Sequence, residues 1–323
     1  MDDFTAKSFI RSLLLKFIII LPASKFCDCS VKCTFKNNVC ELPRYQTLRF
    51  FLLGDFGGLD EEPYTTKIQR KVAELVDRSS NLWHPNFYLT TGDNFYDKGI
   101  DDAYSPRFYA TFESVYSYGR ERNIPWYISA GNHDHMGNVQ AQIDYTRKNP
   151  RWVFPSNYYS IRYSFGGTNR RAGTSVDIFV LDTMLLCGDA RKNIPIKNET
   201  ASEESLKWLE NVLKASEADY IFVAGHFPIY STGKNGNSRC LINRIADMLV
   251  KHKINAYLAG HNHQLEVMGN CGMNFHRQQE MLVDDRGRSN NSVSAKDRVG
   301  SCILEFLSSA KLELVKKNVK MFE

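Results

Sequence analysis

The chain has 323 residues, 43% of them hydrophobic, which is enough apolar material for a sizeable core and excludes an intrinsically disordered chain. The formal net charge is +5, but residues 1–49 hold eight basic and four acidic side chains, which leaves the rest of the chain near neutrality. A body without a basic excess excludes a strongly electrostatic partner, so we expect no binding to nucleic acid.

The first feature in chain order is an apolar stretch at residues 13–21, which is too short to span a bilayer. Basic residues precede it and the small-residue run Pro-Ala-Ser follows it, an order typical of a secretory signal peptide. We therefore predict a signal peptide over residues 1–24 and no stable membrane span. An uncleaved signal anchor is the alternative, because Lys16 interrupts the stretch.

A cysteine-rich lead-in over residues 25–45 follows, with four of the chain's eight cysteines at positions 27, 29, 33 and 40. An even number of cysteines behind a signal-like segment favours disulfides. A zinc site is the alternative, although a Cys-x-Cys pair is unlike the usual spacing of zinc-binding cysteines. Asn198 and Asn290 begin Asn-x-Ser/Thr triplets, which accept N-linked glycans in secreted proteins.

From residue 46 onward no linker interrupts the pattern, so we predict one catalytic domain over residues 46–323. Short apolar runs predict strands, several of them covered on both faces, at 49–53, 86–91, 125–130, 176–181, 219–224 and 255–259. Apolar residues recur at helical spacing in 65–78, 203–215 and 241–252, and polar runs at 166–173 and 286–298 predict loops. Alternating strands and helices indicate an α/β fold with much parallel sheet.

Five of these strands end in the same way, with a glycine followed by a side chain that can bind a metal. Strands of one open α/β sheet present their carboxyl ends at one edge, where ligands collect, and glycine lets the backbone turn sharply there. We therefore expect one crevice that contains the residues after the five glycines and one further histidine, namely Asp55, Asp93, Asn132, His226, His261 and His263.

This set of side chains is too large for one four-coordinate metal and suits two ions about 4 Å apart that share a carboxylate. His261 and His263 form a His-x-His pair, which an extended segment would present on one side. Paired metals of this kind hold the attacking and leaving oxygens of a phosphoryl transfer. A lone histidine after a glycine is more often a core residue than a ligand, but five such strand ends are hard to explain as packing.

Tyr96 follows Asp93 by three residues and has two interpretations. A phenolate is a hard anionic ligand that favours a trivalent ion, and it can reach the same metal as Asp93 if the segment turns. Alternatively, the ring packs on the rim of the site. The spacing alone leaves both interpretations open.

Five segments resemble the motifs of the purple acid phosphatases, and the animal tartrate-resistant type in particular. They are Asp55-Phe56-Gly57, Gly92-Asp93-Asn94-Phe95-Tyr96, Gly131-Asn132-His133-Asp134-His135, Gly225-His226-Phe227-Pro228 and Gly260-His261-Asn262-His263. The likeness runs from about residue 48 to about residue 268. It is specific, since general metallophosphoesterases usually begin with Asp-x-His and lack the tyrosine.

The resemblance implies a four-layer α/β-β/α sandwich of the calcineurin-like metallophosphoesterase type. It further implies a secreted or lysosomal monomer that hydrolyses phosphomonoesters or phosphoproteins at acid pH, through hydroxide formed from a metal-bound water. The implied ligands of Fe(III) are Asp55, Asp93, Tyr96 and His263, and those of Fe(II) or Zn(II) are Asp93, Asn132, His226 and His261. By the same resemblance, His133 protonates the leaving group and Cys187 bonds to Cys240.

The chain also departs from the family pattern. Asn235 stands where mammalian members have a second active-site histidine, and the likeness thins after Val267. Residues 189–202 correspond to a loop that can cover the site in relatives and be cut there, and its basic residues make cleavage plausible here.

Two alternative functions stay open. One is a divalent-metal protein or nucleotide phosphatase that works near neutral pH, from which Tyr96 and the colour of the protein would distinguish this chain. The other is a membrane-anchored scaffold that has the phosphatase fold and an eroded site. The complete set of ligand residues argues against the scaffold.

Overall fold

The computed structural model describes residues 39–42, 47–118, 123–167 and 173–263, and four further strands, Ile18–Ile20 (β1), Thr34–Lys36 (β2), Val267–Gly269 (β12) and Gln279–Met281 (β13). The remainder of the predicted signal peptide and lead-in, Asn290 and the predicted loop at 286–298 lie outside the described residues. Within the described ranges, no helix is long and apolar enough to cross a bilayer.

Two sheets form the centre of the fold. The first has the order β1-β4-β5-β6-β7, built from β4 (Arg49–Leu53), β5 (Phe87–Thr90), β6 (Trp126–Tyr127) and β7 (Trp152–Val153), which run parallel, with β1 antiparallel to β4. The second has the order β11-β10-β9-β8-β3-β2, built on β3 (Val39–Leu42), β8 (Tyr159–Phe165), β9 (Thr174–Val180), β10 (Tyr220–Ala224) and β11 (Ala256–Leu258). In this second sheet β9, β10 and β11 are parallel and β8 is antiparallel to β9. Strands β12 and β13 form a separate two-stranded antiparallel sheet.

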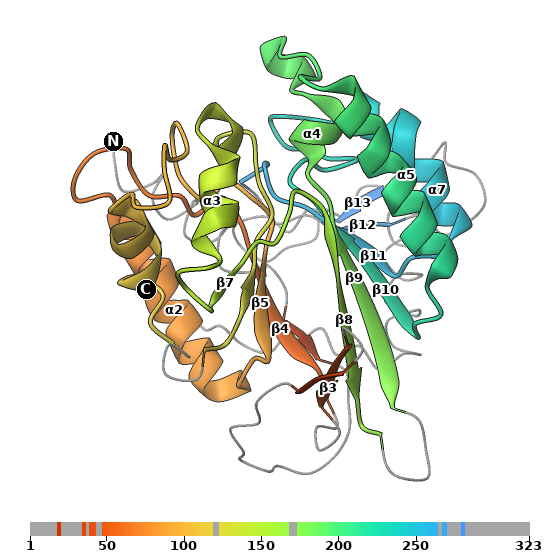
Figure 1. Cartoon of the computed structure of the whole chain (residues 1–323), viewed down its shortest axis with the longest axis horizontal. Coiled ribbons are helices and arrows are strands. Elements are labelled where there is room, and N and C mark those ends of the chain that lie inside the picture. The colour runs from red at the N-terminus through yellow and green to blue at the C-terminus, as the bar shows by residue number, and fades with distance from the viewer. Residues whose placement is uncertain are drawn as a thin grey trace.

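Helices cover the outer face of each sheet, as Figure 1 shows. On one side lie α2 (Lys67–Trp83) and α3 (Val139–Tyr145), and on the other lie α4 (Thr183–Cys187), α5 (Glu199–Ala215) and a run that combines α6 (Arg239–Leu241), a π-helical turn (Ile242–Ala246) and α7 (Asp247–Lys251). Shorter helical turns occupy Phe108–Glu113, Asp134–Met136 and Ala190–Lys192. The arrangement is the helix–sheet–sheet–helix sandwich that the family resemblance implies.

Aromatic side chains join the two sheets. Phe87 of β5 stacks on Tyr163 of β8 with ring centroids 4.9 Å apart, and the hydroxyl groups of Tyr127 and Tyr163 lie 2.9 Å apart. Phe50 of β4 meets Phe222 of β10 edge to face at 6.2 Å. These pairs bury large apolar areas at a fixed sheet separation, so the strand ends of the two sheets are held in register.

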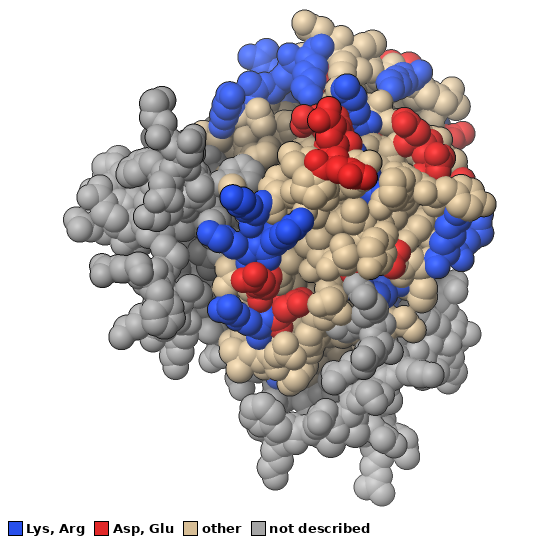
Figure 2. Space-filling model, turned by 90° about the vertical axis from the view of Figure 1, so that its left-hand side faces the viewer, with Lys and Arg blue, Asp and Glu red and all other residues tan. Residues whose placement is uncertain are grey.

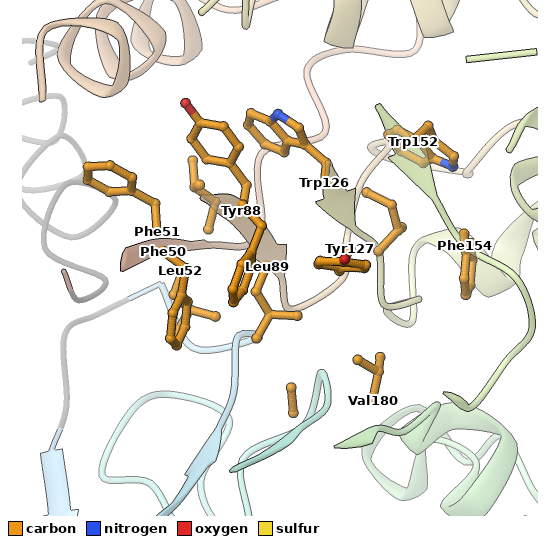
Figure 3. Close-up of a cluster of buried hydrophobic side chains, with 14 of the residues drawn as sticks. Phe50, Phe51, Leu52, Tyr88, Leu89, Trp126, Tyr127, Trp152, Phe154 and Val180 are labelled. Carbon is orange, nitrogen blue, oxygen red and sulfur yellow. The ribbon is translucent and has the colours of Figure 1, made fainter. Parts of the chain in front are cut away.

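The alternation of side chains along the first sheet fills two separate layers of core. Phe51, Tyr88 and Trp126 lie on the side opposite Tyr127, as Figure 3 shows. On that outer side, Val72 of α2 is fully buried in the same hydrophobic cluster. Since side chains alternate with a period of two, one strand sequence serves both the layer between the sheets and the layer under the helices.

Several predicted elements differ in extent from those observed. Strand β6 is shorter than the predicted 125–130, because the chain leaves the sheet after Tyr127 to form the loop that carries Asn132. Helix α2 continues past the predicted end at residue 78, and its buried Ser80 shares a hydrogen bond of 2.8 Å with Tyr88. Strand β8 and helices α3 and α4 were not among the predicted elements.

Basic and acidic groups both occur on the face shown in Figure 2, where clusters of Lys and Arg lie beside Asp and Glu. At the start of α5, the exposed Asn198 uses its side-chain oxygen to accept a hydrogen bond of 3.0 Å from the amide of Ala201. This contact leaves the amide nitrogen of Asn198 available, so glycosylation there stays a prediction.

A disulfide joins Cys187, at the end of α4, to Cys240 in α6, with the Cα atoms 5.9 Å apart. This is the pair that the family resemblance implies. The bond closes a loop with a sequence separation of 53 residues that contains α5 and β10. Cys40 of the lead-in is also disulfide-bonded.

Removing the bond with the double variant Cys187→Ser/Cys240→Ser should lower the free energy of unfolding by about 4 kcal/mol, because the unfolded chain regains the entropy of an open loop of this length. Denaturant titration of both proteins measures the difference. The Cys40 disulfide is present in both proteins and serves as the internal control for reduction. Free thiols at positions 187 and 240 in the native protein would contradict the bond.

Candidate metal centre

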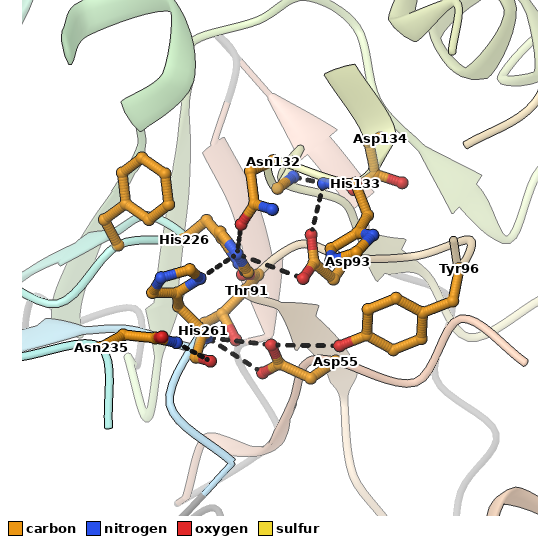
Figure 4. A network of polar contacts seen from close by, with 12 residues as sticks. Asp55, Thr91, Asp93, Tyr96, Asn132, His133, Asp134, His226, Asn235 and His261 are labelled. Atoms are coloured by element: carbon orange, nitrogen blue, oxygen red, sulfur yellow. Dashed lines mark hydrogen bonds and ion pairs between the residues drawn. The ribbon is translucent and has the colours of Figure 1, made fainter. Parts of the chain in front are cut away.

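The seven predicted ligands lie at the carboxyl ends of strands from both sheets. Asp55 follows β4, Asp93 and Tyr96 follow β5, Asn132 follows β6, His226 follows β10, and His261 and His263 follow β11. The expectation that one sheet supplies all of them is therefore wrong. The two sheets face each other, so their strand ends converge at one end of the sandwich. Figure 4 shows six of these side chains gathered there, and His263 lies beside Tyr96 and Asp55.

The first group of ligand atoms centres on the fully buried ring of His226. Its Nδ1 lies 2.7 Å from the carbonyl oxygen of Thr91 and donates to it, so Nε2 is the ring nitrogen that faces the site. That Nε2 lies 3.0 Å from Asn132 Oδ1, 3.2 Å from His261 Nδ1 and 3.4 Å from Asp93 Oδ2. Atoms bound at about 2.1 Å to one ion are separated by roughly 3.0–3.4 Å, so these four atoms fit a single metal.

The second group centres on the hydroxyl oxygen of Tyr96. It lies 2.9 Å from His263 Nε2 and 3.5 Å from Asp55 Oδ1, and the last two atoms are themselves 3.5 Å apart. These separations again suit three ligands of one ion. Of the two interpretations of Tyr96, the geometry favours the one in which its oxygen faces the site.

Asp93 lies between the two groups. Its Oδ2 belongs to the first group, and the Tyr96 hydroxyl also interacts with the Asp93 carboxylate. The remaining oxygen, Oδ1, accepts a hydrogen bond of 2.9 Å from the amide of His133. A carboxylate in this position can bridge two metals, and the amide of His133 fixes its orientation.

The pKa values of the imidazole and phenol groups in the site are shifted by burial and by the charges of the neighbouring carboxylates and of His226. Burial lowers the pKa of His226, but the adjacent Asp93 carboxylate outweighs burial and raises it to about 9. Burial and the charge of His226 lower the pKa of His261 to about 3. Burial and Asp55 raise the pKa of Tyr96 well above its usual value. Without a cation His226 pairs with Asp93 as an imidazolium, and a bound metal would take over that role.

Backbone strain marks three of the seven residues. Asp55, Asp93 and His261 have φ angles of 58°, 53° and 68°, in the left-handed region that residues other than glycine rarely adopt. The expectation that the preceding glycines make the turns is thus mostly wrong, because among them only Gly92 has a positive φ. The metal-facing residues themselves turn the chain and point their side chains into the site.

The glycines are needed instead for close approach. A Cβ atom on Gly131 would lie 2.2 Å from Asp93 Oδ1, and one on Gly260 would lie 2.8 Å from Asp55 Oδ2. At these distances the carboxylates would have to move. The glycines before Asn132 and His261 therefore make room for the two aspartates.

His133 is outside both groups of ligand atoms. Its Nδ1 lies 2.6 Å from the carbonyl oxygen of Asp97, so this nitrogen donates and Nε2 is left to exchange a proton. The ring meets that of Tyr96 edge to face, with centroids 4.8 Å apart. His133 is thus held at the edge of the site without being part of either group.

The sequence analysis missed Asp134, which is fully buried under the site. Its carboxylate accepts hydrogen bonds from the amides of Gly131 and Asn94, at 2.8 Å and 3.1 Å, and from the side chain of Gln142 at 2.8 Å. Burial and the nearby Asp93 charge raise its pKa to about 6. Asp134 joins the two loops that carry Asp93 and Asn132. Its position next to His133, within one of the five family motifs, could have indicated that Asp134 belongs to the site.

A second link that the sequence analysis missed connects the two halves of the site. His135 Nε2 lies 2.7 Å from Asp182 Oδ2, and the other oxygen of Asp182 accepts a hydrogen bond of 2.9 Å from the amide of Leu185 at the start of α4. Burial lowers the pKa of His135, but Asp182 raises it overall. The contact ties the loop after β6 to the loop after β9.

Comparison with known proteins gives consistent matches. The calcineurin-like phosphoesterase family matches residues 48–265. The chain is 40% identical over 234 residues to tartrate-resistant acid phosphatase type 5 of Rattus norvegicus, covering 71% of this chain and 70% of the rat protein. It is 29% identical to purple acid phosphatase 7 of Arabidopsis thaliana, covering 70% of this chain and 67% of the plant protein.

Among solved structures, GAP50, the anchor in the inner membrane complex of Plasmodium, aligns with a TM-score of 0.61 at 22% identity. The alignment covers 75% of this chain and 86% of the Plasmodium protein. At this level of identity the likeness concerns the fold alone.

Gly131→Ala should abolish binding of the ion in the first group, because the added methyl group displaces the Asp93 carboxylate. Elemental analysis of the purified variant measures the bound metal. Gly236→Ala is the matched control, since it places a methyl group where no atom lies within 4 Å while imposing strain at a positive φ. Full metal content in Gly131→Ala would contradict the close approach.

Proposed function

Because the chain belongs to the calcineurin-like phosphoesterase family and matches its purple acid phosphatases, we propose that it is a dinuclear-metal acid phosphatase that hydrolyses phosphomonoesters at acid pH. The observation that carries this proposal is the convergence of two groups of ligand atoms on a shared carboxylate, Asp93. Such a pair of sites suits phosphoryl transfer, in which charge on the attacking and leaving oxygens must be neutralised together.

The residues divide between the two ions as the geometry suggests. Fe(III) would be held by Asp55, Asp93, Tyr96 and His263, and Fe(II) or Zn(II) by Asp93, Asn132, His226 and His261. A hard phenolate donor at Tyr96 suits the trivalent ion, and two imidazoles suit the divalent one. When bound, the two metals supply a nucleophile from water at low pH and neutralise the phosphoryl oxygens.

His133 is proposed as the general acid. Its Nδ1 is held by the Asp97 carbonyl and its backbone amide is held by Asp93, so the ring cannot turn away from the site. In its doubly protonated form the ring carries a second proton on Nε2, which can pass to the departing oxygen. Neither group of ligand atoms requires this nitrogen.

The substrate class is phosphomonoesters, with phosphoproteins included, and the protein is proposed to act as a monomer that is secreted or lysosomal. The disulfide between Cys187 and Cys240 supports an oxidising compartment. A phosphatase that binds only divalent metals and works at neutral pH has less support, because such a site does not need a tyrosine ligand, whereas the Tyr96 oxygen here faces His263. A scaffold with an eroded site has less support, because the seven side chains lie in two groups of close atoms that meet at Asp93.

Metal analysis together with a phosphatase assay tests the proposal directly. The purified protein should contain two metal ions per chain and hydrolyse an aryl phosphate faster at about pH 5 than at neutral pH. A protein with two bound metals and no hydrolysis at any pH would refute the enzymatic function. Activity only near neutral pH would favour the divalent-metal alternative.

The oxidised protein should absorb broadly in the visible, and Tyr96→Phe should remove the band, because the phenolate oxygen that donates charge to iron is lost. An absorption spectrum recorded beside the measured iron content provides the test. Tyr109→Phe, on an exposed ring, controls for loss of a tyrosine elsewhere. A colourless wild type with two metals would rule out the iron–tyrosinate assignment but not hydrolysis.

His133→Ala should keep both metals and lose turnover by about 10²–10⁴-fold with an alkyl phosphate, because the poor leaving group needs a proton. The loss should be much smaller with an activated aryl phosphate, whose phenolate departs without one. Steady-state kinetics on the two substrates gives the ratio. Equal losses on both would mean that His133 only binds the phosphate.

A further inference from the structure

Asn235 connects the metal centre to the loop after α4. Its side-chain Nδ2 donates to the carbonyl oxygen of His261 at 3.1 Å, and its backbone amide donates to Asn262 Oδ1 at 3.0 Å. Its Oδ1 faces the other way and accepts from Arg191 Nη1 at 2.8 Å. One side chain therefore separates the guanidinium of Arg191 from a residue of the first group of ligand atoms, and Figure 4 shows Asn235 beside His261.

These contacts fix the position of the Arg191 guanidinium but use only its Nη1 nitrogen. Nη1 also donates to the carbonyl oxygen of Lys234 at 2.9 Å, and both acceptors are neutral. Among the described residues, Nε and Nη2 have no partner, no acidic side chain pairs with Arg191, and the side chain is exposed. Its full positive charge and two donors are thus available at the rim of the site.

The backbone that carries Arg191 is also fixed. Asp189, buried next to the Cys187 disulfide, pairs with Ile194 through two backbone hydrogen bonds of 2.8 Å and 2.9 Å. The side chain of Asp189 accepts from the amides of Arg191 and Lys192 at 3.2 Å and 3.3 Å. An arginine on a pre-formed loop loses less entropy on binding an anion than one on a free chain.

The rim of the site differs in charge from one side to the other. Arg191 and Lys234 lie on the side of His261, where Arg191 Nη1 donates to the carbonyl oxygen of Lys234 and to Asn235 Oδ1. On the side of His133 lie Asp97 and Asp60, and Asp60 Oδ1 pairs with Arg107 Nη1 at 3.2 Å. An anionic leaving group would therefore be attracted more strongly to the side of Arg191 than to the side of His133.

We propose that Arg191 is a specificity-determining residue that binds a second anionic group, a carboxylate or phosphate, on the alcohol part of the phosphate ester. The proposal rests on the proposed phosphatase function. It adds that small phosphate esters with a second anion are preferred over esters of uncharged alcohols. The unused edge of the guanidinium, Nε and Nη2, presents the two parallel donors that such an anion accepts.

Two non-hydrolysable probes test the preference without turnover. Phenylphosphonate with a para-carboxylate and the same compound with a para-carboxamide differ in one charge and share the phosphonate that occupies the metal centre. Calorimetric titration of the metal-containing protein should give tighter binding of the carboxylate probe. In Arg191→Gln the ratio of the two dissociation constants should fall about threefold to fivefold, the upper range of one ion pair at an exposed rim.

Lys192→Gln is the matched control, because it removes the same charge from the next position, where the side chain is exposed and forms no hydrogen bond or ion pair with the described part of the chain. Its ratio should change by less than about twofold, the size of a screened surface charge effect. Arg191→Lys keeps the charge and should recover only part of the preference, because lysine lacks the planar pair of donors.

An unchanged ratio in Arg191→Gln, an equal fall in Lys192→Gln, or a wild type that binds neither probe would each overturn the assignment of Arg191. Turnover of the corresponding aryl phosphates is measured separately on the wild type. Tight and charge-selective binding without hydrolysis would support the role of Arg191 and sink the proposed phosphatase function. Hydrolysis without charge selectivity would do the reverse.

Discussion

The structure depends on keeping two buried carboxylates, Asp55 and Asp93, charged at the end of a sandwich where they are 3% and 2% exposed. An ionised carboxylate removed from water is costly unless positive charge or hydrogen bonds replace its hydration. Here the backbone amides of His261 and His133 each donate to one of them. Further compensation comes from the Tyr96 hydroxyl and from the imidazole rings of His226 and His263, or from a bound cation. The converging histidines and the phenol are therefore understandable as the surroundings that negative charge requires in an apolar fold.

The same requirement explains why the site lies where two sheets meet. A single sheet edge would leave one side of each carboxylate in water, which favours solvation over metal binding. The sandwich brings β10 against β4 through Phe222 and Phe50, and β8 against β5 through Tyr163 and Phe87. Rigid packing between the sheets thus sets the separation of ligand atoms that lie more than a hundred residues apart in the chain.

The strands and helices that could be predicted from the sequence are those with a strong local pattern of apolar residues. The buried parallel strands are apolar throughout, and α2 and α5 have a clear helical period, so their existence could be predicted. Strand β8 could also have been predicted, because every second side chain in it is apolar or aromatic and buried, namely Tyr159, Ile161, Tyr163 and Phe165. Helices α3 and α4 are short and depend on tertiary contacts, which local sequence does not show.

The candidate site shows the same division. The chemistry of the strand-end residues and the family resemblance together specified which side chains would meet. Sequence could not show that Asp55, Asp93 and His261 take left-handed backbone conformations, because nothing local favours that choice for Asp or His over glycine. Nor could it show that Asn235 holds Arg191, since that contact depends on two loops folding against each other.

The hydrogen bonds of Asp134 limit how the chain length can vary around the site. One carboxylate accepts from Asn94 on one loop, Gly131 on another and Gln142 on α3, so three segments share a single set of acceptors. Adding or removing one residue between Gly92 and Phe95, or between Gly131 and Asp134, would leave a buried amide without an acceptor. These two loops are therefore fixed in length by hydrogen bonding, whereas connections on the outer surface face no such restriction.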